Sequence, residues 1–99
     1  MNKATKNLPA VGDLIQLRNP GDGYYVSFQY ISGAGTVVVE GSNDGQVWFA
    51  LLLDSATTAA TQAASFTAAG GWVGVCPFEF VQARKTVGVL DCLVSLGLV

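Results

Sequence analysis

YYVSFQYISGAGTVVVEGSNDG, residues 24–45, is the stretch of sequence that decides the fold. In its first part Val26, Phe28 and Tyr30 stand two residues apart, with small or polar residues between them. A period of two is the spacing of a strand that buries one face and leaves the other in water. We therefore expect a half-buried strand over residues 24–31.

Two turns frame the next segment of this stretch. Residues 32–35 (Ser-Gly-Ala-Gly) have turn composition, and residues 36–41 are rich in β-branched side chains, which pack well on a pleated surface. Asn43-Asp44-Gly45 predicts a tight turn, because Asn and Asp tolerate a positive φ and Gly adopts it freely. Residues 47–53 follow as an almost continuous apolar run, which predicts a strand buried on both faces.

Short strand signals continue on both sides of this stretch. Residues 14–17 predict a first strand that a turn at residues 19–23 closes, and further strands are predicted at residues 72–75, 79–87 and 89–99. Short strands at this spacing predict an all-β fold, an antiparallel, jelly-roll-like β-sandwich of about seven or eight strands.

The Ala/Thr-rich stretch over residues 55–71 is ambiguous. Its alanines favour helix, its threonines favour strand, and no apolar stripe recurs at helical spacing. We expect a long surface loop with a short strand at residues 64–67, with a helix as the alternative.

The chain ends differ in character. Residues 1–12 hold two lysines, no acid and no periodic apolar pattern, so we expect an extended N-terminal arm, followed by one sandwich domain over residues 13–99. An arm with little to bury locally favours contact with a partner, and Lys3, Lys6 and Asn7 are the predicted contact residues.

Charge is scarce in this chain. Hydrophobic residues make up 51% of the 99 residues and charged residues only 12%. Soluble surfaces usually carry more charge, so much of this surface is expected to be covered by other copies, in a trimer first and a dimer second. A net charge of −2 predicts neither nucleic-acid nor membrane binding, and the apolar C-terminal stretch is too short to span a bilayer.

Residues for catalysis are missing. The chain contains no histidine, which removes the commonest general base and metal ligand, and its carboxylates are scattered. Cys76 and Cys92 cannot form a structural zinc site alone; either they pair or, as we favour, each is a buried free thiol. We expect no enzyme activity, no metal and no cofactor.

Two further sets of residues are open to alternative interpretations. Tyr25 and Trp72 could stack a sugar ring, although aromatic residues also fill sandwich cores. Arg84-Lys85 is an adjacent basic pair that predicts either a solvated strand face or a salt bridge to a neighbouring subunit.

Two segments resemble a known group of proteins. VVVEGSNDGQVWFALL (residues 37–52) and FTAAGGWVGVCPFEFVQARKTV (residues 66–87) are similar to segments of small virion β-sandwich proteins of tailed bacteriophages, of the head-decoration, head-fibre and tail-associated types. In that pattern an Arg follows an aromatic-valine pair, whereas here Arg84 follows Val81-Gln82-Ala83.

The resemblance implies a function that composition cannot supply. It implies a virion structural protein, located in a particle assembled in the host cytoplasm and bound to a major capsid or tail protein. The shortness of the chain favours a capsid decoration, or cement, protein. The alternative is a carbohydrate-binding, receptor-binding module of a tail fibre or tailspike.

Overall fold

The structure is a computed structural model that describes residues 2–19, 25–59 and 61–98. Over these residues the chain forms eleven β-strands and no helix. The strands are β1 (Asn2–Leu8), β2 (Leu14–Arg18), β3 (Tyr25–Gly33), β4 (Thr36–Ser42), β5 (Phe49–Ala50), β6 (Leu53–Ser55), β7 (Gln62–Ala63), β8 (Ser65–Phe66), β9 (Gly70–Val75), β10 (Phe80–Val87) and β11 (Cys92–Leu98).

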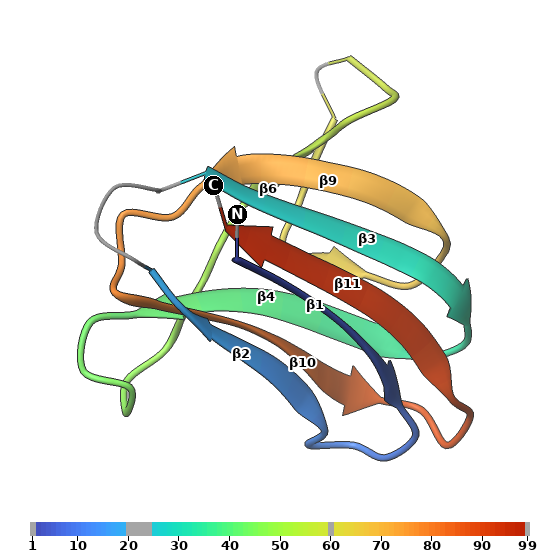
Figure 1. Cartoon of the computed structure of the whole chain (residues 1–99). Helices are drawn as coiled ribbons and strands as arrows, with labels where there is room; N and C mark the ends of the chain where they lie inside the picture. The colour runs from blue at the N-terminus through green and yellow to red at the C-terminus, as the bar shows by residue number, and fades with distance from the viewer. Residues whose placement is uncertain (1, 20–24, 60, 99) are drawn as a thin grey trace.

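Two antiparallel sheets pack face to face (Figure 1). Sheet A has the order β1-β11-β3-β9-β6-β7, and sheet B has the order β2-β10-β4-β5, with β8 also paired to β4. The pairs β1–β11, β2–β10 and β3–β9 are nested, as in a long hairpin rolled into a sandwich. This is jelly-roll connectivity, so the predicted all-β sandwich is confirmed. The strand number exceeds the predicted seven or eight because the middle of the chain forms several very short strands.

Strand β3 is built as its alternation predicts. Val26, Phe28 and Tyr30 are buried, and the residues between them are exposed. The Phe28 ring packs on Phe66 with 5.0 Å between centroids, and the Tyr30 hydroxyl donates to the carbonyl oxygen of Gly35 at 2.9 Å. Desolvation in the core raises the pKa of Tyr30. Strand β3 is therefore held to strand β8 across the core by Phe28 and to the turn before β4 by Tyr30.

The prediction that residues 1–12 form an extended arm outside the sandwich is wrong. Residues 2–8 are strand β1, which pairs with β11 in unbroken register from Asn2↔Leu98 to Leu8↔Cys92. Leu8 is fully buried in the core. Ala4 is small and Leu8 stands four residues later, so the segment gives no strand signal among its polar neighbours, yet β11 offers it a complete hydrogen-bonding edge. The sandwich domain therefore begins at β1 and not at residue 13.

The predicted turn and strand after β4 also differ from the structure. Gly45 has the expected positive φ of 74°, but a six-residue loop, 43–48, separates β4 from β5. The Asp44 carboxylate organises this loop by accepting hydrogen bonds from the amides of Gln46 and Val47, which lowers the pKa of Asp44. The continuous strand predicted over residues 47–53 is wrong, because the chain leaves sheet B after β5 and joins sheet A as β6.

The remaining predictions on local structure hold with small changes. β2, β9, β10 and β11 form where strands were expected, and residues 55–71 carry short strands and, over their described part, no helix. Cys76 and Cys92 are both buried and free, as favoured. Of the turn predicted at residues 19–23, residues 20–23 lie outside the described part of the chain.

Replacing Leu8 by Ala tests the position of β1. The substitution creates a cavity in the core, so we expect the free energy of unfolding to fall by about 2–5 kcal/mol in urea titrations. Val11→Ala, at an exposed position three residues later, is the matched control and should change it by less than about 0.5 kcal/mol. Equal stability of the two variants would show that β1 is not docked in solution.

Candidate functional site

Lys85 is a fully buried cation at one end of the sandwich. Alternation along β10 places it on the inner face with Val81 and Ala83. Its Nζ donates to the carbonyl oxygens of Leu8 at 3.1 Å and Pro9 at 3.2 Å, and also to that of Leu90. An ammonium group has three protons, so these three acceptors can satisfy all of them. The prediction that Lys85 contacts solvent or another subunit is wrong.

Three loops converge around this ammonium group, and we call them the loop end: residues 9–13, 34–35 and 88–91 (Figure 1, at the β10–β11 connection). The Gly12 amide donates to the Lys85 carbonyl and the Lys85 amide to the Asp13 carbonyl, both at 2.9 Å. A Cβ at Gly35, where φ is +136°, would lie 2.9 Å from Lys85 Cε. The loops are thus packed directly on the lysine stem and tied to its backbone.

Large apolar side chains project from the loop end. Val89 is 92% exposed, and three further side chains with more than half of their surface exposed join it in a set that we call the apolar tip: Val11, Val87, Val89 and Leu90. Surface loops usually carry polar residues, so apolar side chains on tightly bonded loops are unusual.

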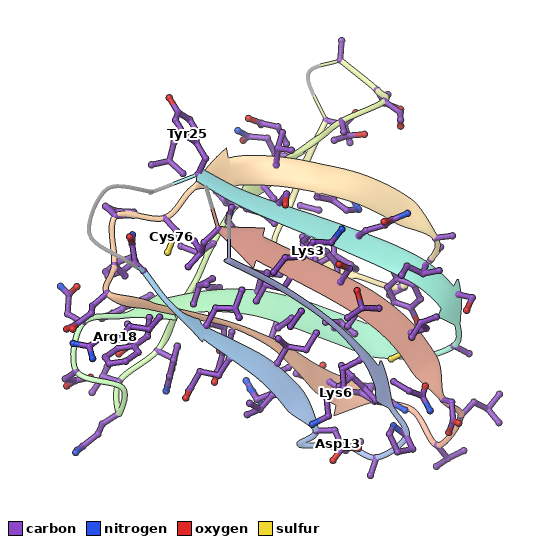
Figure 2. All side chains as sticks on the ribbon, viewed as in Figure 1. Lys3, Lys6, Asp13, Arg18, Tyr25 and Cys76 are labelled. Carbon is purple, nitrogen blue, oxygen red and sulfur yellow. The ribbon has the colours of Figure 1, made fainter. Side chains whose placement is uncertain are left out.

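The predicted contact residues Lys3, Lys6 and Asn7 all lie on the edge strand β1. Lys6 Nζ donates to the Leu14 carbonyl of β2 at 3.2 Å, so it bridges the edge strands of the two sheets. Asn7 donates to the Asp91 carboxylate at 3.0 Å within the loop end. Lys3 lies nearer the start of β1, apart from Lys6 (Figure 2). Lys6 and Asn7 therefore each have a hydrogen-bond partner within the chain.

Arg84 lies on the outer face of sheet B, opposite in direction to Lys85. Its guanidinium binds both oxygens of the Glu40 carboxylate, at 2.9 and 3.2 Å, and Gln82 donates to the same carboxylate at 3.0 Å. The hydrogen bonds from Arg84 hold the pKa of Glu40 below its ordinary value of 4.5, and the pKa of Arg84 is raised in turn. Arg84 is thus paired within the chain, while part of its side chain stays exposed.

Tyr25 and Trp72 do not form one aromatic platform. Trp72 lies opposite the buried Phe28 in the β3–β9 register, and its ring packs on Phe66 at 4.9 Å. Tyr25 points to the other face of β3 and is exposed near the end opposite the loop end (Figure 2). Because the two rings project from opposite faces of sheet A, a sugar cannot stack on both.

A groove of about 510 Å³ crosses the outer face of sheet A. Its lining runs from Lys3 on β1, past Ser95, Ser27 and Gln29, to Trp72 and the loop after β6. Trp72 is the one predicted sugar-contact residue in this lining; Lys3 was predicted as a protein contact. Sequence reasoning missed Ser27, Gln29 and Ser95 because each appears only as a polar outer residue of a strand.

Two further kinds of feature bear on function, metal-binding clusters and membrane-spanning helices. Residues 2–19, 25–59 and 61–98 contain no group of three His, Cys, Asp or Glu side chains placed to hold a metal ion. The same ranges contain no helix long and apolar enough to cross a membrane.

The chain is a jelly-roll β-sandwich with exposed apolar side chains at its loop end and a groove on the outer face of sheet A. No protein-family model and no curated protein matches the chain. Among solved structures, the SPBc2 prophage-derived protein YomS is similar, with a TM-score of 0.66 over 100% of this chain and 96% of that one, at 10% sequence identity. At this identity the similarity establishes a shared fold.

Replacing Glu40 by Gln tests the ion pair through pH. A carboxyl whose pKa is lowered by folding stabilises the native state above its unfolded pKa, and this contribution disappears as pH falls through the folded pKa. We expect Glu40→Gln to reduce stability by about 1 kcal/mol at pH 7, because part of the pair is exposed. Urea titrations should show this difference shrinking below the ordinary pKa of 4.5. A difference that stays constant down to strongly acidic pH would contradict the pairing.

Proposed function

We propose that this chain is a structural protein of a bacteriophage virion, a capsid decoration protein that docks on the particle through its apolar tip. The resemblance of residues 37–52 and 66–87 to virion proteins supports the phage assignment. The fold shared with a prophage-derived protein agrees with it. In this proposal the protein resides in the virion and binds a capsid protein.

The apolar tip is the observation that carries the proposal. Val87 ends strand β10, and Val89 and Leu90 lie on the following loop, whose Leu90 carbonyl accepts a hydrogen bond from Lys85. A contact surface that is already ordered in the free protein loses less conformational entropy on binding. Each such side chain, once buried by a partner, contributes about 1.5–3 kcal/mol. A small rigid domain with this end can therefore bind a particle without a large interface.

Scarce charge supports self-association as part of the same proposal. Only 12% of the residues are charged, and ten large hydrophobic side chains are exposed in the described residues. We propose a homo-oligomer, with a trimer preferred to a dimer. Several tips on one oligomer would engage several capsid subunits together, which raises avidity beyond that of a single tip.

Charged substitutions at the apolar tip test the docking. We expect Val89→Asp combined with Leu90→Asp to weaken binding to heads of the encoding phage, prepared without this protein, by at least about a hundredfold. Leu52→Asp, at a similarly exposed position outside the loop end, is the matched control and should bind normally. Sedimentation with heads gives the affinity, and light scattering of the free protein gives its oligomeric state.

Two outcomes would contradict this proposal. Unchanged binding by the double variant, with thermal stability equal to that of the control, would show that the tip is not the docking surface. Lack of binding to heads by the unsubstituted protein would contradict the decoration function itself.

A further inference from the structure

The polar side chains on the outer faces of the two sheets differ in how far they hydrogen-bond to one another. On sheet B, Gln16 donates to Gln82 at 3.4 Å, Gln82 donates to Glu40 at 3.0 Å, and Arg84 binds Glu40 through two nitrogens. The polar groups of that face are largely satisfied by one another. Such a face needs no ligand to complete its hydrogen bonds.

On the outer face of sheet A, most polar groups that line the groove have donors or acceptors without a hydrogen-bond partner among the described residues. Lys3, Ser27 and Gln29 make no side-chain hydrogen bond or ion pair with any described residue. Ser95 is only 7% exposed, and its hydroxyl accepts a hydrogen bond from Thr5 at 3.1 Å, which leaves its own proton to donate. These donors and acceptors face a shared space of about 510 Å³.

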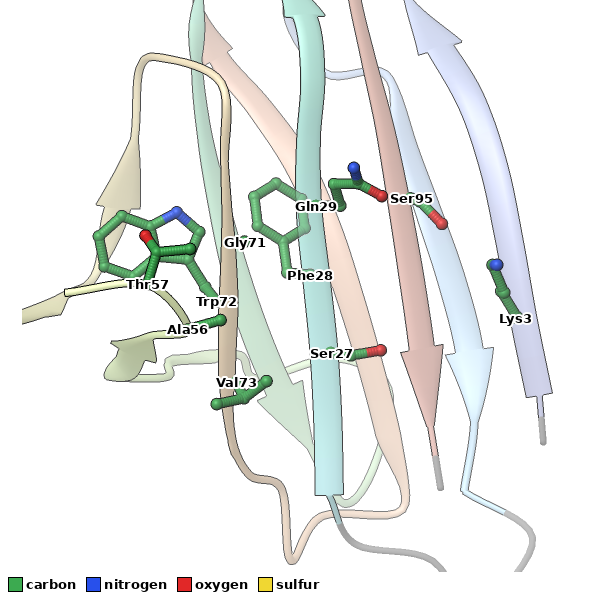
Figure 3. Close-up of a pocket in the computed structure, with 10 residues that line it drawn as sticks. All are labelled: Lys3, Ser27, Phe28, Gln29, Ala56, Thr57, Gly71, Trp72, Val73 and Ser95. Atoms are coloured by element: carbon green, nitrogen blue, oxygen red, sulfur yellow. The ribbon is translucent and has the colours of Figure 1, made fainter. Parts of the chain in front are cut away.

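The groove runs across the strands. Register places Ser95 beside Gln29 and Gln29 beside Gly71, so the lining crosses β11, β3 and β9 in a row, with Lys3 on β1 at one end. Four adjacent strands span about 15 Å at the usual strand spacing. Figure 3 shows Lys3 at one end, Trp72 and Thr57 at the other, and the hydroxyl and amide groups between them.

The charge of the residues that line the groove favours a ligand with a negative group. The lining contains one cation, Lys3, and no acid, and it combines hydroxyl and amide groups with the apolar surface of Val73 and Ala56. Small residues such as Gly71 and Ser27 let a ligand approach the sheet closely. Alternating hydroxyl-rich and apolar surface, together with a negative group, is the chemistry of an acidic sugar chain.

We propose that this groove binds an oligosaccharide that carries a carboxylate, with Lys3 pairing with the carboxylate and Ser27, Gln29 and Ser95 bonding sugar hydroxyls. An extended peptide fits less well, because it would bind by main-chain hydrogen bonds at a sheet edge, whereas backbone groups under the groove are already paired between strands. A nucleic acid needs several cations along its phosphates, and the lining offers one.

This binding function goes beyond docking on a particle and is compatible with it. The groove lies on the face of sheet A, whereas the apolar tip lies on the loops at one end. A protein docked by its loop end would keep the groove open to solvent. Success or failure in the head-binding assay is therefore independent of sugar binding by the free protein.

The test uses tetragalacturonate, 3′-sialyllactose and a hyaluronan tetrasaccharide as carboxylated probes, and maltotetraose as the neutral probe. Proton–nitrogen NMR titration of the intact protein should give saturable shifts at β1, β11, β3 and β9 with at least one carboxylated probe, at millimolar or lower concentration. Lys3→Gln should weaken this binding about tenfold, and Gln29→Ala about threefold. Lys6→Gln, on the same strand but outside the groove, should leave it unchanged.

Three results would overturn the proposal. They are no saturable shift with any carboxylated probe at millimolar concentration, equal weakening by Lys3→Gln and Lys6→Gln, and binding of maltotetraose as tight as that of the carboxylated probes. The first excludes a sugar site, the second shows non-specific attraction, and the third removes the role of the carboxylate. Spectra of the free variants that match the unsubstituted protein show that the fold is intact.

Discussion

The ammonium group of Lys85 donates hydrogen bonds to the carbonyls of Leu8, Pro9 and Leu90. These bonds join the first strand of the chain to the loop before its last strand. Burying a cation costs several kcal/mol unless all of its protons find acceptors. The end of β1 and the loops 9–13 and 88–91 must therefore hold their carbonyls around Nζ, which ties the end of β1 to the loop before β11. The same constraint sets the positions from which Val89 and Leu90 project.

The alternation of apolar and polar residues made strand β3, in the middle of sheet A, predictable from the sequence. Val26, Phe28 and Tyr30 are large, regularly spaced and bounded by turn residues, so their burial required no tertiary information. Strand β1 was not predictable in this way, because its pairing depends on β11, which lies at the other end of the chain. Its polar composition suits an edge strand, where Lys6 also discourages pairing with further chains.

The candidate sites were less predictable than the fold. Lys85 follows Val81 and Ala83 at a period of two, which is a signal for the inner face, but a lysine near a strand end usually reaches solvent. Its burial depends on carbonyls supplied by two distant loops. The groove likewise depends on register across four strands, which places Ser95, Gln29 and Gly71 side by side. Single-strand patterns contain no information of that kind.

Direct observation of the Lys85 ammonium group by proton–nitrogen NMR at neutral pH is the measurement closest to the central claim. A buried ammonium with three carbonyl acceptors should give a sharp signal that exchanges slowly with water, and this signal should couple along the side chain of Lys85. The ammonium groups of Lys3 and Lys6, on an edge strand near solvent, should exchange much faster. A Lys85 signal that exchanges as fast as theirs would contradict the buried cation and, with it, the account of the loop end.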